Sequence, residues 1–448
     1  VYQHALKGFA FAGPPTAAGG IARNPFVAFV EPDQEVHAHC HLGDPQVVPT
    51  GIQRTFADEN PNITIDDNDD LRIDVDVAVL DTGIDLDHFD LNVFAGVDCT
   101  KGPSCELGGD GNDGNGHGTH VSGTIAAIDG GGGVVGVAPG ARLWAVKVLR
   151  NDGRSFLSDV IEGIDYVTAN AGAIEVANMS LGCKCTSNAL NTAIANSVAV
   201  GVVYTVSAGN SDADASDFSP ANHPDVITVS NLADSDGLPD GIGGATCNGN
   251  DDDTLASFSN WGSLIEITAP GVCILSLWKD GMCAVLSGTS MSSPHVAGAA
   301  ALLASGANAP INKTEALAIR QTIIDEGNFD WTDDSGDGIQ EPLLDVGNDL
   351  VFDPVFVPEP GAVWQLGSGI GLLALLVRRR RRRTTYDTPA GAPDRAALTS
   401  RRTKVPRRPR KRRLNLDPRG LLSCRAEVRD IGRIESDRHR SGKTRHRV

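Results

Sequence analysis

Short apolar runs alternate with segments of helical period from about residue 72 onward. The apolar runs are rich in β-branched residues and predict strands at 75–80, 145–149, 174–179, 200–206, 226–229 and 265–268. The helical segments lie at 119–128, 157–170, 188–197, 290–304 and 314–324. Runs that are apolar throughout are typical of strands buried on both faces. Their alternation with helices predicts an α/β fold, in which helices cover both faces of a parallel β-sheet.

Composition and charge narrow the class of protein. The chain has 448 residues, 41% hydrophobic and 5% aromatic, which disfavours a collagen, a low-complexity chain or a multi-span membrane protein. Residues 1–377 carry 13 Lys and Arg against 50 Asp and Glu, whereas residues 378–448 carry 25 against 7. The acidic body would repel phosphates, so we expect no nucleic-acid partner. The basic end is poor in apolar residues, which predicts disorder.

Two motifs near the first predicted strand offer an acid and a base. Asp81 directly follows that strand, before Thr82 and Gly83, although a lone acid there is usually a turn former or a helix cap. His117 opens a predicted helix between two glycines, which leave it accessible to take and return a proton at neutral pH. His120 is better explained as a packed histidine. A two-histidine metal site is disfavoured because no glutamate lies between the pair as in His-Glu-x-x-His.

A third motif places Ser290 at the start of a helix. A serine at such a position is most often a helix cap. Here Gly288 precedes it and small residues follow it, so a substrate backbone can approach closely. The amide donors and the positive dipole end of the helix would also stabilise a developing oxyanion. The motif therefore favours a nucleophilic serine over a cap.

The three motifs, in this chain order, resemble the signatures of the subtilisin family of serine proteases. The similarity extends over roughly residues 46–325. It implies that Ser290 is the nucleophile and that His117 is the general base and then the general acid. Asp81 would fix the imidazole tautomer and stabilise its charged form. Asn210 matches the family's asparagine that donates to the oxyanion, beside the Ser290 backbone N–H.

The resemblance also implies a binding site for extended peptide, which would pair with two segments of the enzyme as an added strand. The substrate-binding residues would be Gly153, Arg154, Ser155, Ser180, Leu181 and Gly182, with Ser207 and Gly209 in the wall of the side-chain pocket. No acidic residue can be placed securely in this pocket. We therefore expect broad specificity with an apolar or aromatic bias.

A structural calcium site is a further implication of the resemblance, with oxygen ligands from side chains and backbone. The residues implied are Gln46, Asp90, Ile128, Gly130, Gly132 and Val134. Gly130 stands where the family usually has an asparagine. Either Asp129 replaces that ligand or the site is weak.

A second acidic segment resembles the start of an EF-hand loop, with Asp333, Ser335 and Asp337 followed by Gly338. The twelfth position, however, is Leu344 and not glutamate. A solvated acidic loop is the favoured interpretation of this segment.

The spacing of the cysteines indicates whether the protein resides in an oxidising or a reducing compartment. Cys99 lies close to Cys105 and Cys273 close to Cys283, and no Cys-x-x-Cys zinc pattern occurs. These pairs favour disulfides and an oxidising compartment over scattered buried thiols.

Both ends of the chain resemble processing segments. Residues 1–43 are similar to the C-terminal part of the inhibitory propeptide of subtilases, a partial α+β domain that would act as an intramolecular inhibitor. At the other end, Pro-Glu-Pro at 358–360, an apolar stretch at 362–377 and six arginines at 378–383 resemble the bacterial PEP-CTERM sorting signal. Sixteen helical residues reach about 24 Å, short of a ~30 Å hydrocarbon core, so we expect only transient membrane association.

The sequence thus predicts four parts. They are a partial propeptide at 1–43, a subtilisin-like catalytic domain at 44–352, a proline-rich linker with a sorting signal at 353–383 and a basic tail at 384–448. The predicted protein is an exported, monomeric serine endopeptidase, secreted or associated with the cell envelope, that cleaves protein or peptide substrates through an acyl-enzyme.

Two other functions stay open. A catalytically silent subtilase scaffold that binds a partner at the surface would be free to lose its triad or Asn210. A metal-dependent hydrolase would lose turnover as soon as its metal is chelated.

Overall fold

The computed structural model describes residues 45–358, except residues 70, 103, 131 and 240, together with Asn24 and Val27. The chain divides into two compact units, Val1–Leu373 and Ala374–Val448, and all described residues belong to the first. The predictions of a propeptide at 1–43, an apolar stretch at 362–377 and a tail at 384–448 therefore lie outside the described residues, apart from Asn24 and Val27. Among the described residues no helix is long and apolar enough to cross a membrane.

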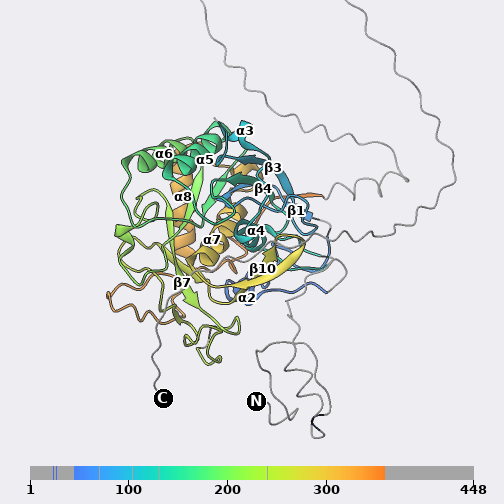
Figure 1. The fold of residues 1–448 in the computed structure, drawn as a ribbon. Helices are drawn as coiled ribbons and strands as arrows, with labels where there is room; N and C mark the ends of the chain where they lie inside the picture. Colours follow the sequence, from blue (N-terminus) through green and yellow to red (C-terminus); the bar gives the residue numbers. More distant parts are fainter. Residues whose placement is uncertain are drawn as a thin grey trace, which may run out of the picture. The chain divides into compact units, whose positions relative to one another are not determined.

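The body is built on one eight-stranded sheet with the order β3-β4-β2-β5-β6-β7-β8, in which β9 also pairs with β7 (Figure 1). Its strands are β2 (Asp76–Asp81), β3 (Val93–Asp98), β4 (Arg142–Lys147), β5 (Val176–Met179), β6 (Val203–Ser207), β7 (Ile227–Ala233), β8 (Thr254–Leu255) and β9 (Ile267–Pro270). Every pairing is parallel except β7 with β8. All residues of β2, β5, β6 and β7 are buried, which explains the unbroken apolar runs of the sequence.

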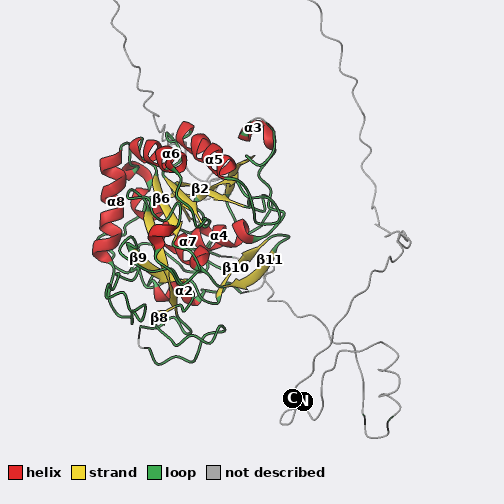
Figure 2. Ribbon diagram, turned by 60° about the vertical axis from the view of Figure 1, so that its left-hand side comes forward, coloured by secondary structure: helices red, strands yellow, loops and turns green. Residues whose placement is uncertain are grey.

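Helices pack on both sides of the sheet, as predicted. Figure 2 shows α4 and α7 together on one side, and α5, α6 and α8 along the other. These helices are α4 (His117–Ala126), α5 (Leu157–Ala169), α6 (Asn188–Ala199), α7 (Thr289–Ala304) and α8 (Lys313–Glu326). In α7 all residues except Ser290 and Leu303 are buried, because this helix packs against α4 and the central strands. Ser290, at its N-terminal end, stays accessible.

Smaller elements complete the body. A hairpin joins β10 (Ile274–Trp278) to β11 (Met282–Leu286), and β1 (Leu71–Ile73) pairs with β12 (Phe356–Pro358). The short helices are α2 (Thr50–Arg54), α3 (Cys105–Gly108), η1 (Ala215–Asp217) and η2 (Gly306–Asn308). The linker predicted from residue 353 differs here, since residues 356–358 form a strand. Proline is tolerated in it because a two-stranded edge does not require every backbone donor.

Disulfides join Cys99 to Cys105, Cys183 to Cys185 and Cys247 to Cys273, and Cys283 is also disulfide-bonded. The first confirms a predicted pair, whereas the predicted pairing of Cys273 with Cys283 is wrong. The β10–β11 hairpin explains why, since Ile274, next to Cys273, pairs with Leu286, and Cys283 pairs with Leu277. Three to four residues of strand separate the two cysteines along the hairpin, roughly 10–13 Å, which is beyond disulfide reach.

Candidate active site

Asp81 and His117 meet at the carboxyl end of β2. Asp81 is the last residue of this strand and is fully buried, whereas His117 is the first residue of α4. The His117 Nδ1 atom lies 2.8 Å from Asp81 Oδ1. Asp81 Oδ1 also accepts a hydrogen bond from the Thr82 backbone N–H at 2.6 Å. The carboxylate is thus held where it keeps the proton of the neutral imidazole on Nδ1 and leaves Nε2 as the basic atom.

Asp113, which sequence reasoning missed, supports His117 from the loop before α4. Its Oδ1 accepts from the backbone N–H groups of Asn115 and Gly116, at 2.8 and 2.9 Å. Its Oδ2 accepts from the Thr119 N–H and hydroxyl, at 3.0 and 2.7 Å, and so satisfies free donors at the helix start. Burial lowers the pKa of His117, but the charge and hydrogen bond of Asp81 and the charge of Asp113 together outweigh it and raise the pKa above its usual 6.5.

Ser290 faces Ser180, the first residue after β5. The Ser180 hydroxyl donates to the Ser290 carbonyl oxygen at 2.8 Å. The Ser290 hydroxyl donates in return to the Ser180 carbonyl oxygen, at a long 3.3 Å. Within the described residues the Ser290 hydroxyl makes this hydrogen bond and none to His117. Its weak bond leaves the hydroxyl easy to reorient, as is common where no substrate is bound.

Asn210 follows β6 and lies beside the start of α7. Its Oδ1 accepts from the Thr289 backbone N–H at 2.9 Å and from the Thr289 hydroxyl at 3.0 Å. Because the amide oxygen takes both donors, the Nδ2 group is the part left to donate elsewhere. A Cβ atom built on Gly288 would lie 3.3 Å from this Nδ2, so the amide nitrogen faces the backbone just before Ser290.

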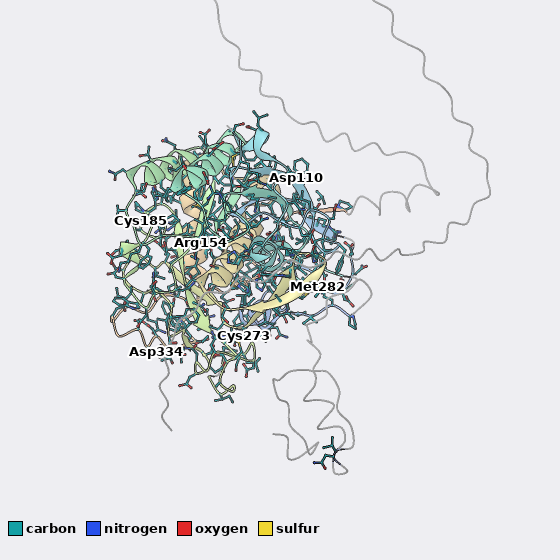
Figure 3. The ribbon with its side chains drawn as sticks, viewed as in Figure 1. Asp110, Arg154, Cys185, Cys273, Met282 and Asp334 are labelled. Atoms are coloured by element: carbon teal, nitrogen blue, oxygen red, sulfur yellow. A yellow bond between two sulfur atoms is a disulfide. The ribbon has the colours of Figure 1, made fainter. Side chains whose placement is uncertain are left out.

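A cleft of about 550 Å³ runs beside His117. It is lined by Gly153, Arg154, Ser155, Ser180, Leu181 and Gly182, and by the apolar side chains of Phe156, Leu157, Val160 and Leu190. Six of the eight predicted substrate-binding residues therefore lie along one groove; Figure 3 labels Arg154 among them. The other two do not line it: Ser207 is buried in β6, and the Gly209 N–H donates to the Thr289 hydroxyl at 3.1 Å.

His120 is a packed histidine, as predicted. Its ring is fully buried, and Nε2 lies 3.1 Å from the Ile274 carbonyl oxygen and 3.2 Å from that of Ala284. Burial, together with the charge of His117, lowers the pKa of His120 to about 3. This ring is therefore neutral near pH 7.

The residues predicted for calcium also lie together. The Val134 N–H donates to Asp90 Oδ2 at 3.1 Å, and the Ile128 N–H donates to the Asp90 carbonyl oxygen at 3.1 Å. The Gly130 N–H donates to Gln46 Oε1. The Asp129 carboxylate lies in the same place, where it accepts from the Gln46 side chain and from two backbone N–H groups, at 66 and 67.

The electrostatics of this site suit a hard cation. Asp90 is 2% exposed, and burial, with the charges of Asp69 and Asp129, raises its pKa to about 8 despite the Val134 N–H and Arg72. Carboxylate and amide side-chain oxygens are ligands that Ca²⁺ prefers in proteins. Gln46 and Asp90, with the described residues of the loop 128–134, therefore fit the ion that the sequence implied.

An imidazole held by a buried carboxylate, a serine at a helix N-terminus and a groove suited to an extended chain define a serine hydrolase. The comparisons with known proteins agree with this class. A family model described as "Subtilase family" matches residues 73–342. The chain belongs to the subtilase family of serine endopeptidases.

Individual relatives resemble different shares of the chain. "Subtilisin DY" of Bacillus licheniformis is 40% identical over 263 residues, which is 58% of this chain and 85% of that protein. "Alkaline serine exoprotease A" of Vibrio alginolyticus is 35% identical over 323 residues, which is 71% of this chain and 56% of that protein. A solved structure of a cold adapted subtilisin-like serine proteinase, 33% identical, superposes with a TM-score of 0.53 and covers 67% of this chain and 98% of its own.

Proposed function

We propose that the protein is an exported endopeptidase that cleaves peptide bonds with Ser290 as nucleophile. The observation that carries this proposal is the 2.8 Å contact between Asp81 and His117, because His117 lines the cleft together with Ser180, which is hydrogen-bonded to Ser290. His117 Nε2 takes the hydroxyl proton while Ser290 Oγ bonds to the scissile carbonyl carbon. The same proton then passes to the leaving amine, and water releases the acyl group by the reverse sequence.

Two donors stabilise the oxyanion in this proposal. One is the backbone N–H of Ser290 at the start of α7, where the helix dipole also favours negative charge. The other is Asn210 Nδ2, which is free because Thr289 occupies the amide oxygen. Both are fixed before substrate arrives, so little reorganisation is needed in the transition state.

The substrate in this proposal is an extended polypeptide. Residues 153–155 and 180–182 flank the groove and offer backbone donors and acceptors for an added strand. Phe156 and Leu157 add apolar surface, which supports a preference for apolar or aromatic side chains.

Calcium, in this proposal, has a structural role. Gln46 and Asp90, with backbone carbonyls of the loop 128–134, would hold the ion, which supplies charge neutralisation for Asp90 and takes no part in the chemistry. The propeptide at 1–43 would inhibit the enzyme until it is removed. Export and transient membrane association through residues 362–377 complete the proposal, and the disulfides of the body support an oxidising compartment.

The test is hydrolysis of a denatured protein by two matched variants of α7. Ser290→Ala removes the nucleophile and is expected to abolish turnover. Ser292→Ala removes a buried hydroxyl that has no hydrogen-bond partner in the described part of the chain, so it is expected to keep full activity. Retained turnover in Ser290→Ala would overturn the proposal.

A further inference from the structure

The acidic loop 333–341 lies outside the catalytic groove, after α8. Figure 3 shows its labelled residue, Asp334, well away from Arg154. The Ser335 hydroxyl lies 3.2 Å from Asp333 Oδ2 and 3.1 Å from Asp337 Oδ1. The side chains of the first, third and fifth positions of this loop therefore converge. Gly338, at the sixth position, has φ of 82°, the left-handed conformation for which an EF-hand loop requires glycine.

A buried carboxylate completes this group of side chains. Glu341, at the ninth position, is 5% exposed, and within the described chain its carboxylate has no partner on another residue. Burial and the charges of Asp333 and Asp337 raise the pKa of Glu341 to about 8. Asp337 Oδ2 is also buried and without a hydrogen-bond partner among the described residues. Asp337 Oδ1 accepts from the Ile339 N–H at 2.8 Å, so Oδ2 is the oxygen of Asp337 that has no partner there, and the charge of Asp337 acts on Glu341.

Such an arrangement is costly unless a cation neutralises it, because the charges of Asp333, Asp337 and Glu341 repel one another and Asp337 Oδ2 is removed from water. Oxygen donors at alternate positions are the pattern with which a loop surrounds Ca²⁺. The twelfth residue, Leu344, cannot be a ligand, because it is fully buried in the core of the body. Glu341 is therefore the acidic group that closes the loop.

We propose that residues 333–341 bind a calcium ion. The ligands are the side chains of Asp333, Ser335, Asp337 and Glu341 and the carbonyl oxygen of Ile339. This site is independent of the proposed peptidase chemistry and of the site at Asp90, and it replaces the solvated loop that the sequence favoured.

The loop is anchored to a small core. The Trp331 indole N–H donates to the Glu341 carbonyl oxygen at 3.0 Å. Trp331 also packs with Leu232, Leu255 and Leu343, which join β7, β8 and the segment after the loop. An ion in the loop would therefore stabilise this edge of the sheet, and Trp331 lies close enough to transfer excitation energy to a bound lanthanide.

A second acidic cluster serves as a comparison. The carboxylate oxygens of Asp234, Asp236 and Asp252 lie within 4.8 Å of one another. Backbone N–H groups already donate to each of them, for example from Gly237 to Asp234 at 3.0 Å and from Ser235 to Asp252 at 2.8 Å. Its carboxylates therefore already have partners, and a variant of this cluster serves as a control for the loop.

The experiment uses the full chain carrying Ser290→Ala, which prevents self-digestion, after removal of metals. Terbium(III) alone is the probe, and its luminescence is excited through tryptophan and then competed with Ca²⁺. Asp337→Asn and Glu341→Gln are each expected to weaken terbium binding at this signal by at least 10-fold. Asp334→Asn removes the same charge from an exposed second position and is expected to bind as the parent does, as is Asp236→Asn.

Three results would overturn the proposal. The first is no tryptophan-excited signal in the parent chain. The second is an unchanged affinity in both Asp337→Asn and Glu341→Gln. The third is a signal lost in Asp236→Asn or in Asp334→Asn instead. Far-ultraviolet circular dichroism of each variant checks the fold, and Ser335→Ala replaces any variant that does not fold.

Discussion

The variants Asn210→Asp and Asn210→Ala together distinguish the role of the Asn210 amide oxygen from that of its NH₂ group. Asn210 Oδ1 accepts two hydrogen bonds from Thr289, a fully buried residue, while Nδ2 is free to donate to the oxyanion. Aspartate keeps an acceptor for Thr289 but has no donor. Alanine removes both, and a buried N–H left without a partner costs about 1–3 kcal/mol of stability.

We expect kcat to fall by about 10²–10³ in both variants, equivalent to about 2.7–4 kcal/mol, the range known for such a donor in subtilisin, a relative of this chain. KM should change little, because the donor acts on charge that develops only in the transition state. Thermal unfolding should separate the variants: Asn210→Ala loses several degrees in Tm, whereas Asn210→Asp stays near the parent. Wild-type kcat in Asn210→Asp would refute the role of Nδ2.

Three further outcomes follow from the site. kcat/KM should rise with pH through an inflection above 6.5, because His117, whose pKa is raised, loses its proton there. Asp113→Asn should move that inflection to lower pH. Identical profiles for the parent and Asp113→Asn would contradict the electrostatic role of Asp113. Phe156→Ala should raise KM for apolar peptides roughly 5- to 30-fold at nearly constant kcat, since this 68% exposed ring lines the cleft, whereas Phe329→Ala outside it should have no effect. A chelator should lower Tm by about 5 °C without stopping turnover at low temperature. Most of that decrease in Tm should be absent in Asp90→Asn. An immediate loss of turnover on chelation would contradict a purely structural role for calcium.

The central strands could be predicted because they are buried on both faces and therefore read as apolar runs. The pattern is weaker for β3, an edge strand in which Phe94 is exposed and Gly96 interrupts the run. The β10–β11 hairpin was missed although Asp280-Gly281 at its turn is a common hairpin signal. A search for alternating runs around such pairs would have found it.

The candidate catalytic residues could be named from local motifs, but their supports could not. The contact of Ser180 with Ser290 joins residues 110 positions apart and depends on how β5 meets α7. The supporting role of Asp113 could have been predicted, since an acid a few residues before a helix is a typical cap. The hairpin register separates Cys273 from Cys283, and Cys247 reaches Cys273 from a loop 26 residues earlier, neither of which cysteine spacing contains.

The most direct test of the account is to locate the residue that phenylmethanesulfonyl fluoride modifies, by peptide mass mapping of the inactivated enzyme. The account predicts one sulfonyl group per chain, on Ser290, and no modification in Ser290→Ala or in His117→Ala, which lacks the base. Inactivation with the sulfonyl group on another residue and Ser290 unmodified would contradict it.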